Sequence, residues 1–321
     1  MTTLCRATGL PMIRVAFSVL ILSLASGGLA LAGEKEDKEK AEGAFKEGVA
    51  QLQKGDYDEA IKAFDQSIKL APKHAFAYNA RASAHWGKND IDKALKDYNR
   101  AIELKPTEAE FYRNRAIAYM DKGDLDKAMA DYSQALGIDP KDSLSYYGRG
   151  TIQAAKENWK QALAEHTKAI EYSPQLAEAY NDRGTCYWQL GDLDKALTDF
   201  NQAIERKPQL MNAYYNRGCV NAEKEEFAKS LEDFDRVIKA QPGFVEAYMD
   251  RGQVYRKKGD LDKALTDFDS ALRLNPDEVG AYLLRAYTYK KKGDTKKAAA
   301  DLEKAKKLGA TAEQIKEAEK W

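Results

Sequence analysis

The side chains best suited to catalysis are few and scattered in this sequence of 321 residues. The only histidines are His74, His85 and His166, and no His-Glu-x-x-His pair, glycine-rich phosphate loop or Gly-x-Ser-x-Gly turn accompanies them. A catalytic site needs a base, a nucleophile or a metal ligand beside a partner group. We therefore expect no enzyme activity, no catalytic or metal-binding residues, and no cofactor.

Two cysteines, Cys186 and Cys219, remain once the first 32 residues are set aside. They could pair in an oxidising compartment. A disulfide needs Cα atoms within about 7 Å, and stacked helices usually run farther apart. We favour two buried thiols, and the sequence leaves a disulfide open.

Arginine recurs at a fixed interval of 34 residues, and each arginine is followed by an acid 16 residues later. The pairs are Arg81 with Asp97, Arg115 with Asp131, Arg149 with Glu165, Arg183 with Asp199, Arg217 with Asp233, Arg251 with Asp267, and Arg285 with Asp301. We interpret them as ion pairs that brace two helices, because the 51 basic residues equal the 51 acidic ones and no basic tract follows a phosphate backbone. Nucleic acid is not an expected partner.

Proline follows the same 34-residue interval, at Pro72, Pro106, Pro140, Pro174, Pro208, Pro242 and Pro276. A period of this size is typical of a stacked array whose units bury their apolar faces against neighbours. The interval defines eight units, at residues 41–74, 75–108, 109–142, 143–176, 177–210, 211–244, 245–278 and 279–312.

Each unit is predicted to form two helices joined by a short turn. In the fifth unit the run 177–190 has Tyr180, Gly184 and Tyr187 on one helical face. Gly191 then tolerates a positive φ, and Asp192 can cap the second helix. The fourth and sixth units have Glu157-Asn158 and Glu225-Glu226 at this turn instead, so we expect local strain or mobility there.

The pattern within each unit resembles the tetratricopeptide repeat family. Seven units have Tyr at repeat position 4, all have Gly or Ala at position 8, and six have Phe or Tyr at position 24, where His166 and Leu302 depart from the pattern. The resemblance covers residues 41–312. It implies an all-α, right-handed superhelical solenoid of eight helix-turn-helix units. A charged lead-in at residues 33–40 would precede the units, and a capping helix at 313–321 would follow them.

The resemblance also implies a concave groove lined by the first helix of each unit. Carried over, its partner-binding residues are Phe45, Val49, Phe76, Asn79, Trp86, Arg113, Ile117, Met120, Leu144, Tyr147, Asn181, Thr185, Trp188, Tyr215 and Arg256. Aromatic and aliphatic side chains on an open face suit a peptide or helix of a protein partner. Trp86 and Trp188 would anchor it without contributing to stability. Neighbouring side chains or a partner subunit could instead cover part of this face.

A carboxylate clamp of the kind some family members carry is not expected. In the best frame Leu144 and Gly148 stand where the clamp needs cations, and in another frame Glu246 and Asp250 do.

Residues 1–32 have the pattern of a secretory signal peptide. Arg6 and Arg14 precede a mostly apolar run at 15–25, and Ala30-Leu31-Ala32 provides a small-residue end. We expect cleavage before Gly33, only transient membrane contact, and a periplasmic or secreted protein. Met12 could be the true start, and an uncleaved membrane anchor is the alternative.

Together these features predict a non-enzymatic scaffold for protein partners in envelope or secreted complex assembly. One alternative is an accessory subunit of an envelope enzyme complex. Another is an RNA-binding helical-repeat protein, which the repeat period, the leader and the balanced charge disfavour. Self-association through exposed apolar faces stays open.

Overall fold

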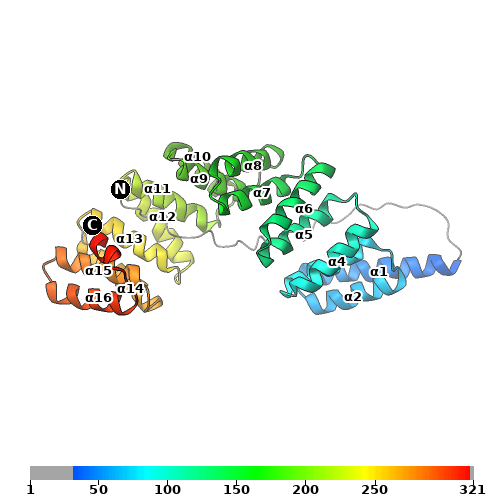
Figure 1. Cartoon of the computed structure of the whole chain (residues 1–321), viewed down its shortest axis with the longest axis horizontal. Coiled ribbons are helices and arrows are strands. Elements are labelled where there is room, and N and C mark those ends of the chain that lie inside the picture. The colour runs from blue at the N-terminus through cyan, green and yellow to red at the C-terminus, as the bar shows by residue number, and fades with distance from the viewer. Residues whose placement is uncertain (1–31, 319–321) are drawn as a thin grey trace. The chain divides into compact units, whose positions relative to one another are not determined.

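The structure, a computed structural model, describes residues 32–318 (Figure 1). The predicted leader up to residue 31, and residues 319–321 of the predicted capping helix, lie outside the described residues.

Within residues 32–318 the chain forms α-helices and no strand, so the fold is all-α as predicted. The first helices of the successive pairs are α1 (Ala32–Lys54), α3 (Ala75–Gly87), α5 (Ala109–Lys122), α7 (Ser143–Ala155), α9 (Ala177–Gln189), α11 (Met211–Glu223), α13 (Val245–Lys257) and α15 (Val279–Lys291). The second helices are α2 (Tyr57–Leu70), α4 (Ile91–Leu104), α6 (Leu125–Ile138), α8 (Trp159–Tyr172), α10 (Leu193–Arg206), α12 (Phe227–Ala240), α14 (Leu261–Leu274) and α16 (Thr295–Lys307). A short helix, α17 (Ala312–Ala318), follows.

Each first helix packs against the second helix that follows it, as Figure 1 shows. From α3 onward, every first helix begins at the first residue of a unit defined by the proline interval. Helix α1 begins at Ala32, so the charged lead-in extends the first helix. At the other end α17 packs on α15, and Ile315 joins the apolar cluster around Leu283 and Ala305.

The described chain divides into two compact units, one with α1 to α8 and one with α9 to α17. Within each unit, consecutive first helices contact one another: α1 with α3, α3 with α5 and α5 with α7, then α9 with α11, α11 with α13 and α13 with α15. No comparable contact joins consecutive second helices in the described chain. The first helices therefore form a layer of their own in each unit.

The turn inside each pair has one residue in the left-handed region. Gly55, Gly123, Gly191, Gly259 and Gly293 fill this position with φ of 79° to 87°, whereas Asn89, Glu157 and Glu225 fill it with φ of 66°, 58° and 60°. In α5 the Gly123 N–H donates to the Met120 carbonyl and the Asp124 N–H to the Tyr119 carbonyl, both at 2.9 Å. Glu157 and Asn158 make the same two bonds at the end of α7, also at 2.9 Å.

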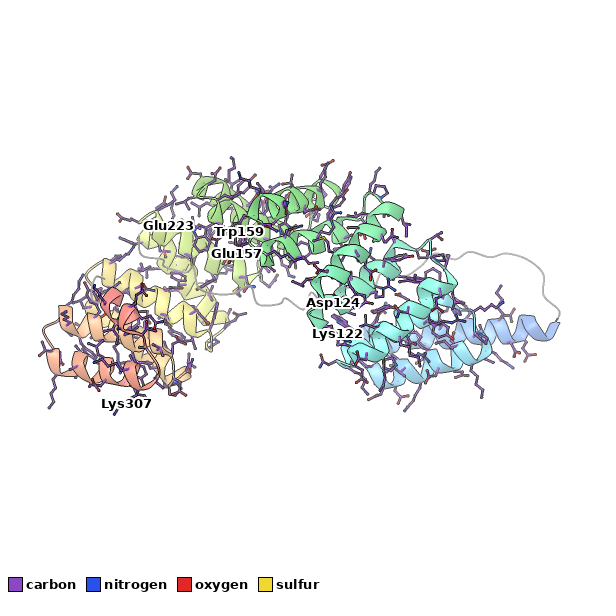
Figure 2. All side chains as sticks on the ribbon, in the orientation of Figure 1. Lys122, Asp124, Glu157, Trp159, Glu223 and Lys307 are labelled. Atoms are coloured by element: carbon purple, nitrogen blue, oxygen red, sulfur yellow. The ribbon has the colours of Figure 1, made fainter. Side chains whose placement is uncertain are left out.

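The turns of the fourth and sixth units therefore keep the backbone conformation of the others. Their strain lies in holding a glutamate where a Cβ is disfavoured. The side chains of Asn158 and Glu226 also do not cap the second helix. In five other turns an aspartate carboxylate accepts a hydrogen bond from the backbone N–H three residues later, namely at Asp56, Asp124, Asp192, Asp260 and Asp294. Figure 2 shows Asp124 and Lys122 at one turn and Glu157 with Trp159 at another.

Small residues sit where the two helices of a pair approach most closely. A Cβ on Gly184 would lie 2.8 Å from Cε1 of Phe200 and 3.2 Å from the Ala196 carbonyl oxygen. Ala196 and Phe200 are fully buried, and His166 is fully buried at the place that Phe200 has in its own pair. The close packing predicted from the repeat pattern is confirmed here.

Candidate partner-binding site

All seven arginines at the 34-residue interval form ion pairs within the protein. Nε and Nη2 of Arg81 donate to the two carboxylate oxygens of Asp97, each at 2.7 Å, and the other six arginines pair with the predicted acids in the same two-pronged way at 2.5 to 3.2 Å. The predicted bracing of each helix pair is confirmed.

Several of these arginines also reach back to the preceding pair. Nη1 donates from Arg81 to Asp65 at 2.6 Å, from Arg251 to Asp235 at 2.6 Å, and from Arg285 to Asp269 at 2.7 Å. With their charges met on both sides, these side chains are structural and are not open to a ligand.

The predicted partner-binding residues lie on the first helices, and we call them the first-helix surface. The members that are at most 8% exposed are Phe45, Asn79, Tyr147, Asn181, Trp188, Tyr215 and Arg256. Those that are partly exposed are Val49, Phe76, Trp86, Arg113, Ile117, Met120, Leu144 and Thr185. About half of these residues are thus largely buried within the chain.

Polar members of the first-helix surface bond to the first helix of the next pair. The Trp86 indole N–H donates to Asp121 at 2.7 Å, the Trp188 indole N–H donates to Glu223 at 2.8 Å, and the Tyr215 hydroxyl donates to Asp250 at 2.6 Å. Amide pairs do the same, from Asn114 to Asn79 and from Asn216 to Asn181, both at 3.1 Å. These side chains hold neighbouring pairs in register, a role the sequence analysis missed.

The expectation that neither tryptophan contributes to the stability of the fold is therefore wrong for Trp188. This residue is 4% exposed and packs in the core of the compact unit formed by α9 to α17. The sequence did contain a signal for this role. Each of these three donors is followed 35 residues later by an acid, which is one unit plus one position.

Apolar side chains remain accessible on the first helices of the compact unit formed by α1 to α8. Ile117 and Met120 of α5 and Leu144 of α7 are partly exposed, and α5 contacts α7. Phe76 of α3 is also partly exposed, with its ring edge-on to Phe111 at 5.1 Å. Parts of these side chains also pack inside the chain, since Lys105 Nζ lies 4.7 Å from the Phe76 ring centre and Ile117 and Met120 contact a buried cluster. The remaining exposed part of these residues offers apolar contact area.

The first-helix surface is more polar in the compact unit formed by α9 to α17. The Thr185 hydroxyl is tied to the Asn181 carbonyl at 3.1 Å. Asp250 accepts from Tyr215 and, at 3.0 Å, from the Gln253 amide, and burial raises the pKa of Asp250 to about 7. Near the end of α13, burial lowers the pKa of Arg256, whose guanidinium carbon lies 4.9 Å from the Tyr287 ring centre.

Cys186 is a buried free thiol, and burial raises its pKa to about 12. A disulfide between Cys186 and Cys219, which the sequence left open, is not formed.

The histidines serve packing roles in separate places. His74 lies 4.8 Å from the Phe45 ring, His166 lies 5.5 Å from the Tyr147 ring, and His85 Nδ1 is 4.0 Å from the Asp90 carboxylate. Across residues 32–318, no cluster of three or more His, Cys, Asp or Glu side chains has an arrangement that could hold a metal ion. Among the helices of this same range, none is both long and apolar enough to span a membrane.

Comparison with solved structures identifies helical-repeat proteins. YrrB, described as a TPR protein with an unusual peptide-binding site, is 27% identical, with a TM-score of 0.50 over 58% of this chain and 96% of that one. A tetratricopeptide repeat protein from Parabacteroides merdae is 21% identical, with a TM-score of 0.57 over 77% and 97% of the two chains. A chain of the APC/C hetero-tetramer Cut9-Hcn1 is 16% identical, with a TM-score of 0.64 over 89% and 58%. At these identities the last two show the fold alone.

No curated protein matches the sequence. Family profiles described as tetratricopeptide or TPR repeats match residues 29–75, 45–109, 79–143, 177–210, 212–244, 252–293 and 279–308. The longest stretch that they leave out, 144–176, lies in the unit with His166 and the Glu157 turn. The repeat profiles, the helix pairs and the solved relatives agree that this chain belongs to the tetratricopeptide repeat family.

Proposed function

We propose that this protein is a non-enzymatic scaffold that binds a peptide or helix of another protein on its first-helix surface. The observation that carries the proposal is the partly exposed apolar group of Ile117, Met120 and Leu144 on the contacting helices α5 and α7. Apolar side chains held on rigid helices give contact area at low entropic cost. The peptide-binding site named for YrrB supports the same class of partner.

We further propose that the scaffold works in the periplasm or outside the cell, in the assembly of an envelope or secreted complex, with the leader removed before Gly33. This rests on the signal-peptide pattern of residues 1–32. N-terminal sequencing of the native protein tests the cleavage. An intact leader would support the membrane-anchored alternative instead.

Crosslinked pull-down from the native envelope tests the scaffold itself. The double variant Ile117→Ser/Leu144→Ser should recover about tenfold less partner, because truncated apolar anchors typically cost 1 kcal/mol or more each. The matched control is Ile138→Ser, which removes an exposed isoleucine from the second helix α6 of the same unit. Far-UV circular dichroism confirms that all variants are folded. Equal recovery by the double variant and the control would reject the proposal.

The alternative of an accessory enzyme subunit predicts an activity that copurifies with the wild-type protein. The RNA alternative predicts retention of single-stranded RNA on a filter at low salt. The internal pairing of the repeated arginines weighs against RNA binding.

A further inference from the structure

Arg256 differs from the seven arginines of the 34-residue interval. They pair with carboxylates, whereas Arg256 is 7% exposed and makes no ion pair within the described chain. Its Nε and Nη1 are buried with no hydrogen-bond acceptor. A buried donor without an acceptor destabilises the folded state, and more strongly when it is charged. Such a side chain is in place for an acceptor that comes from outside.

The surroundings of Arg256 add positive charge. The Tyr287 ring of α15 lies 4.9 Å from the guanidinium carbon of Arg256 and 5.3 Å from the Lys291 Nζ. Lys257 and Lys290 are exposed on the same two helices. A ring face attracts cations without neutralising them, so this end of α13 and α15 keeps its charge.

Neighbouring charges do not cancel this charge. Lys292, next to Lys291, is held by Asp262, but Lys290 and Lys291 make no ion pair within the described chain. The acids Glu246 and Asp250 lie toward the opposite end of α13, and Asp250 is engaged by Tyr215 and Gln253.

We propose that Arg256, Tyr287 and Lys291 form a subsite for a carboxylate side chain in an acidic segment of the protein partner. The inference rests on the proposed scaffold function and assigns the chemistry of one end of the partner. Carboxylate is the occupant we favour because every arginine of the interval in this chain is matched by a carboxylate. The Tyr287 ring would pack against the aliphatic part of the bound residue. The subsite differs from a carboxylate clamp, whose positions hold Glu246 and Asp250 here.

Fluorescence anisotropy with a labelled hexaglutamate peptide and the purified protein tests the subsite. We expect saturable binding of hexaglutamate and none of hexaglutamine. Arg256→Gln should weaken binding at least about tenfold, equivalent to about 1.4 kcal/mol. Arg256→Lys, which keeps the charge, should restore part of the loss. The matched control Arg273→Gln removes an exposed arginine from α14 of the same unit and should change binding less than twofold.

Lys291→Gln provides a second reading, because Lys291 is exposed and its loss should leave folding intact even if Arg256→Gln does not fold. It should weaken hexaglutamate binding about threefold. Equal binding by wild type, Lys291→Gln and Arg256→Gln would overturn the subsite. Displacement of the peptide by an equal concentration of inorganic phosphate would also overturn it, in favour of a general anion site.

The pull-down separates this inference from the function it rests on. If Arg256→Gln recovers the native partner as well as wild type does, the subsite is wrong and the scaffold stands. If wild type recovers no partner, the scaffold function fails, whatever hexaglutamate does.

Discussion

At the scale of single residues, the closest contact in a helix pair depends on a missing side chain. A Cβ on Gly184 would sit 2.8 Å from the buried Phe200 ring. Alanine alone would favour the helix by about 1 kcal/mol, but overpacking of this kind costs about 1–3 kcal/mol. We expect Gly184→Ala to lower the free energy of unfolding, measured by urea denaturation.

Gly137 provides the control. It lies exposed in α6, and the nearest contact of an added Cβ would be the Gln134 side chain at 3.9 Å. Gly137→Ala should therefore raise the free energy of unfolding by about 0.5–1 kcal/mol. If Gly184→Ala were as stabilising as Gly137→Ala, the close packing described for α9 and α10 would be wrong.

Asp250 makes stability depend on pH. Burial, the largest cause, raises the pKa of Asp250 in the folded protein to about 7. The folded state then binds more protons than the unfolded state from about pH 4 to pH 7, so the free energy of unfolding falls as pH rises through this range. Asp250→Asn removes this dependence.

The wild-type free energy of unfolding should therefore fall by roughly 1 to 3 kcal/mol more than that of Asp250→Asn when the pH is raised from 5 to 8. Urea denaturation at the two pH values measures this difference. The exposed Asp277 supplies the control, as Asp277→Asn should show no such difference. A pH-independent effect of Asp250→Asn would contradict the assignment.

Residue roles were predictable where both partners lie within one 34-residue unit. The pairs such as Arg81 with Asp97 follow from the sequence because both members recur at the same interval. The bonds of Trp188 and Tyr215 cross from one unit to the next, and their burial depends on how units stack. That stacking distance is set by packing in three dimensions, so the repeat pattern alone predicted an open face for these side chains.

At the scale of the element, the turn of the fourth unit holds Glu157 at a φ of 58° without a side-chain cap at Asn158. A residue with a Cβ in the left-handed region costs about 1 kcal/mol relative to glycine. Glu157→Gly should therefore raise the free energy of unfolding by about 0.5–1 kcal/mol, as measured by thermal and urea denaturation.

Ala164→Gly tests that this gain belongs to the turn. Ala164 is exposed inside α8, where glycine costs about 1 kcal/mol through backbone entropy. The two substitutions should shift stability in opposite directions. A loss of stability in Glu157→Gly would show that the glutamate side chain supports the turn.

The starts of the first helices follow from the sequence because proline, turn residue and aromatic positions repeat together. From α3 to α15, each first helix begins where a 34-residue unit begins. The shared backbone of the Glu157 and Gly123 turns was not predicted. The residue types there predicted local strain or mobility, but the two hydrogen bonds that close the turn involve backbone atoms alone.

At the scale of the whole molecule, repetition explains both what could and what could not be predicted. Helix pairs that cannot bury their apolar faces alone stack on their neighbours, and the α17 residue Ile315 covers the last pair. The division into two compact units was not visible in the sequence, since the proline interval runs unchanged through Pro174.

We propose that the layer of first helices meets the protein partner. A photo-crosslinking amino acid placed at Leu144 of α7 and, separately, at the exposed Lys168 of the second helix α8 tests it most directly in native envelope extracts. We expect a crosslinked protein adduct from position 144 and none from position 168. An adduct from position 168 alone would show that the partner binds the second helices, and would contradict the account.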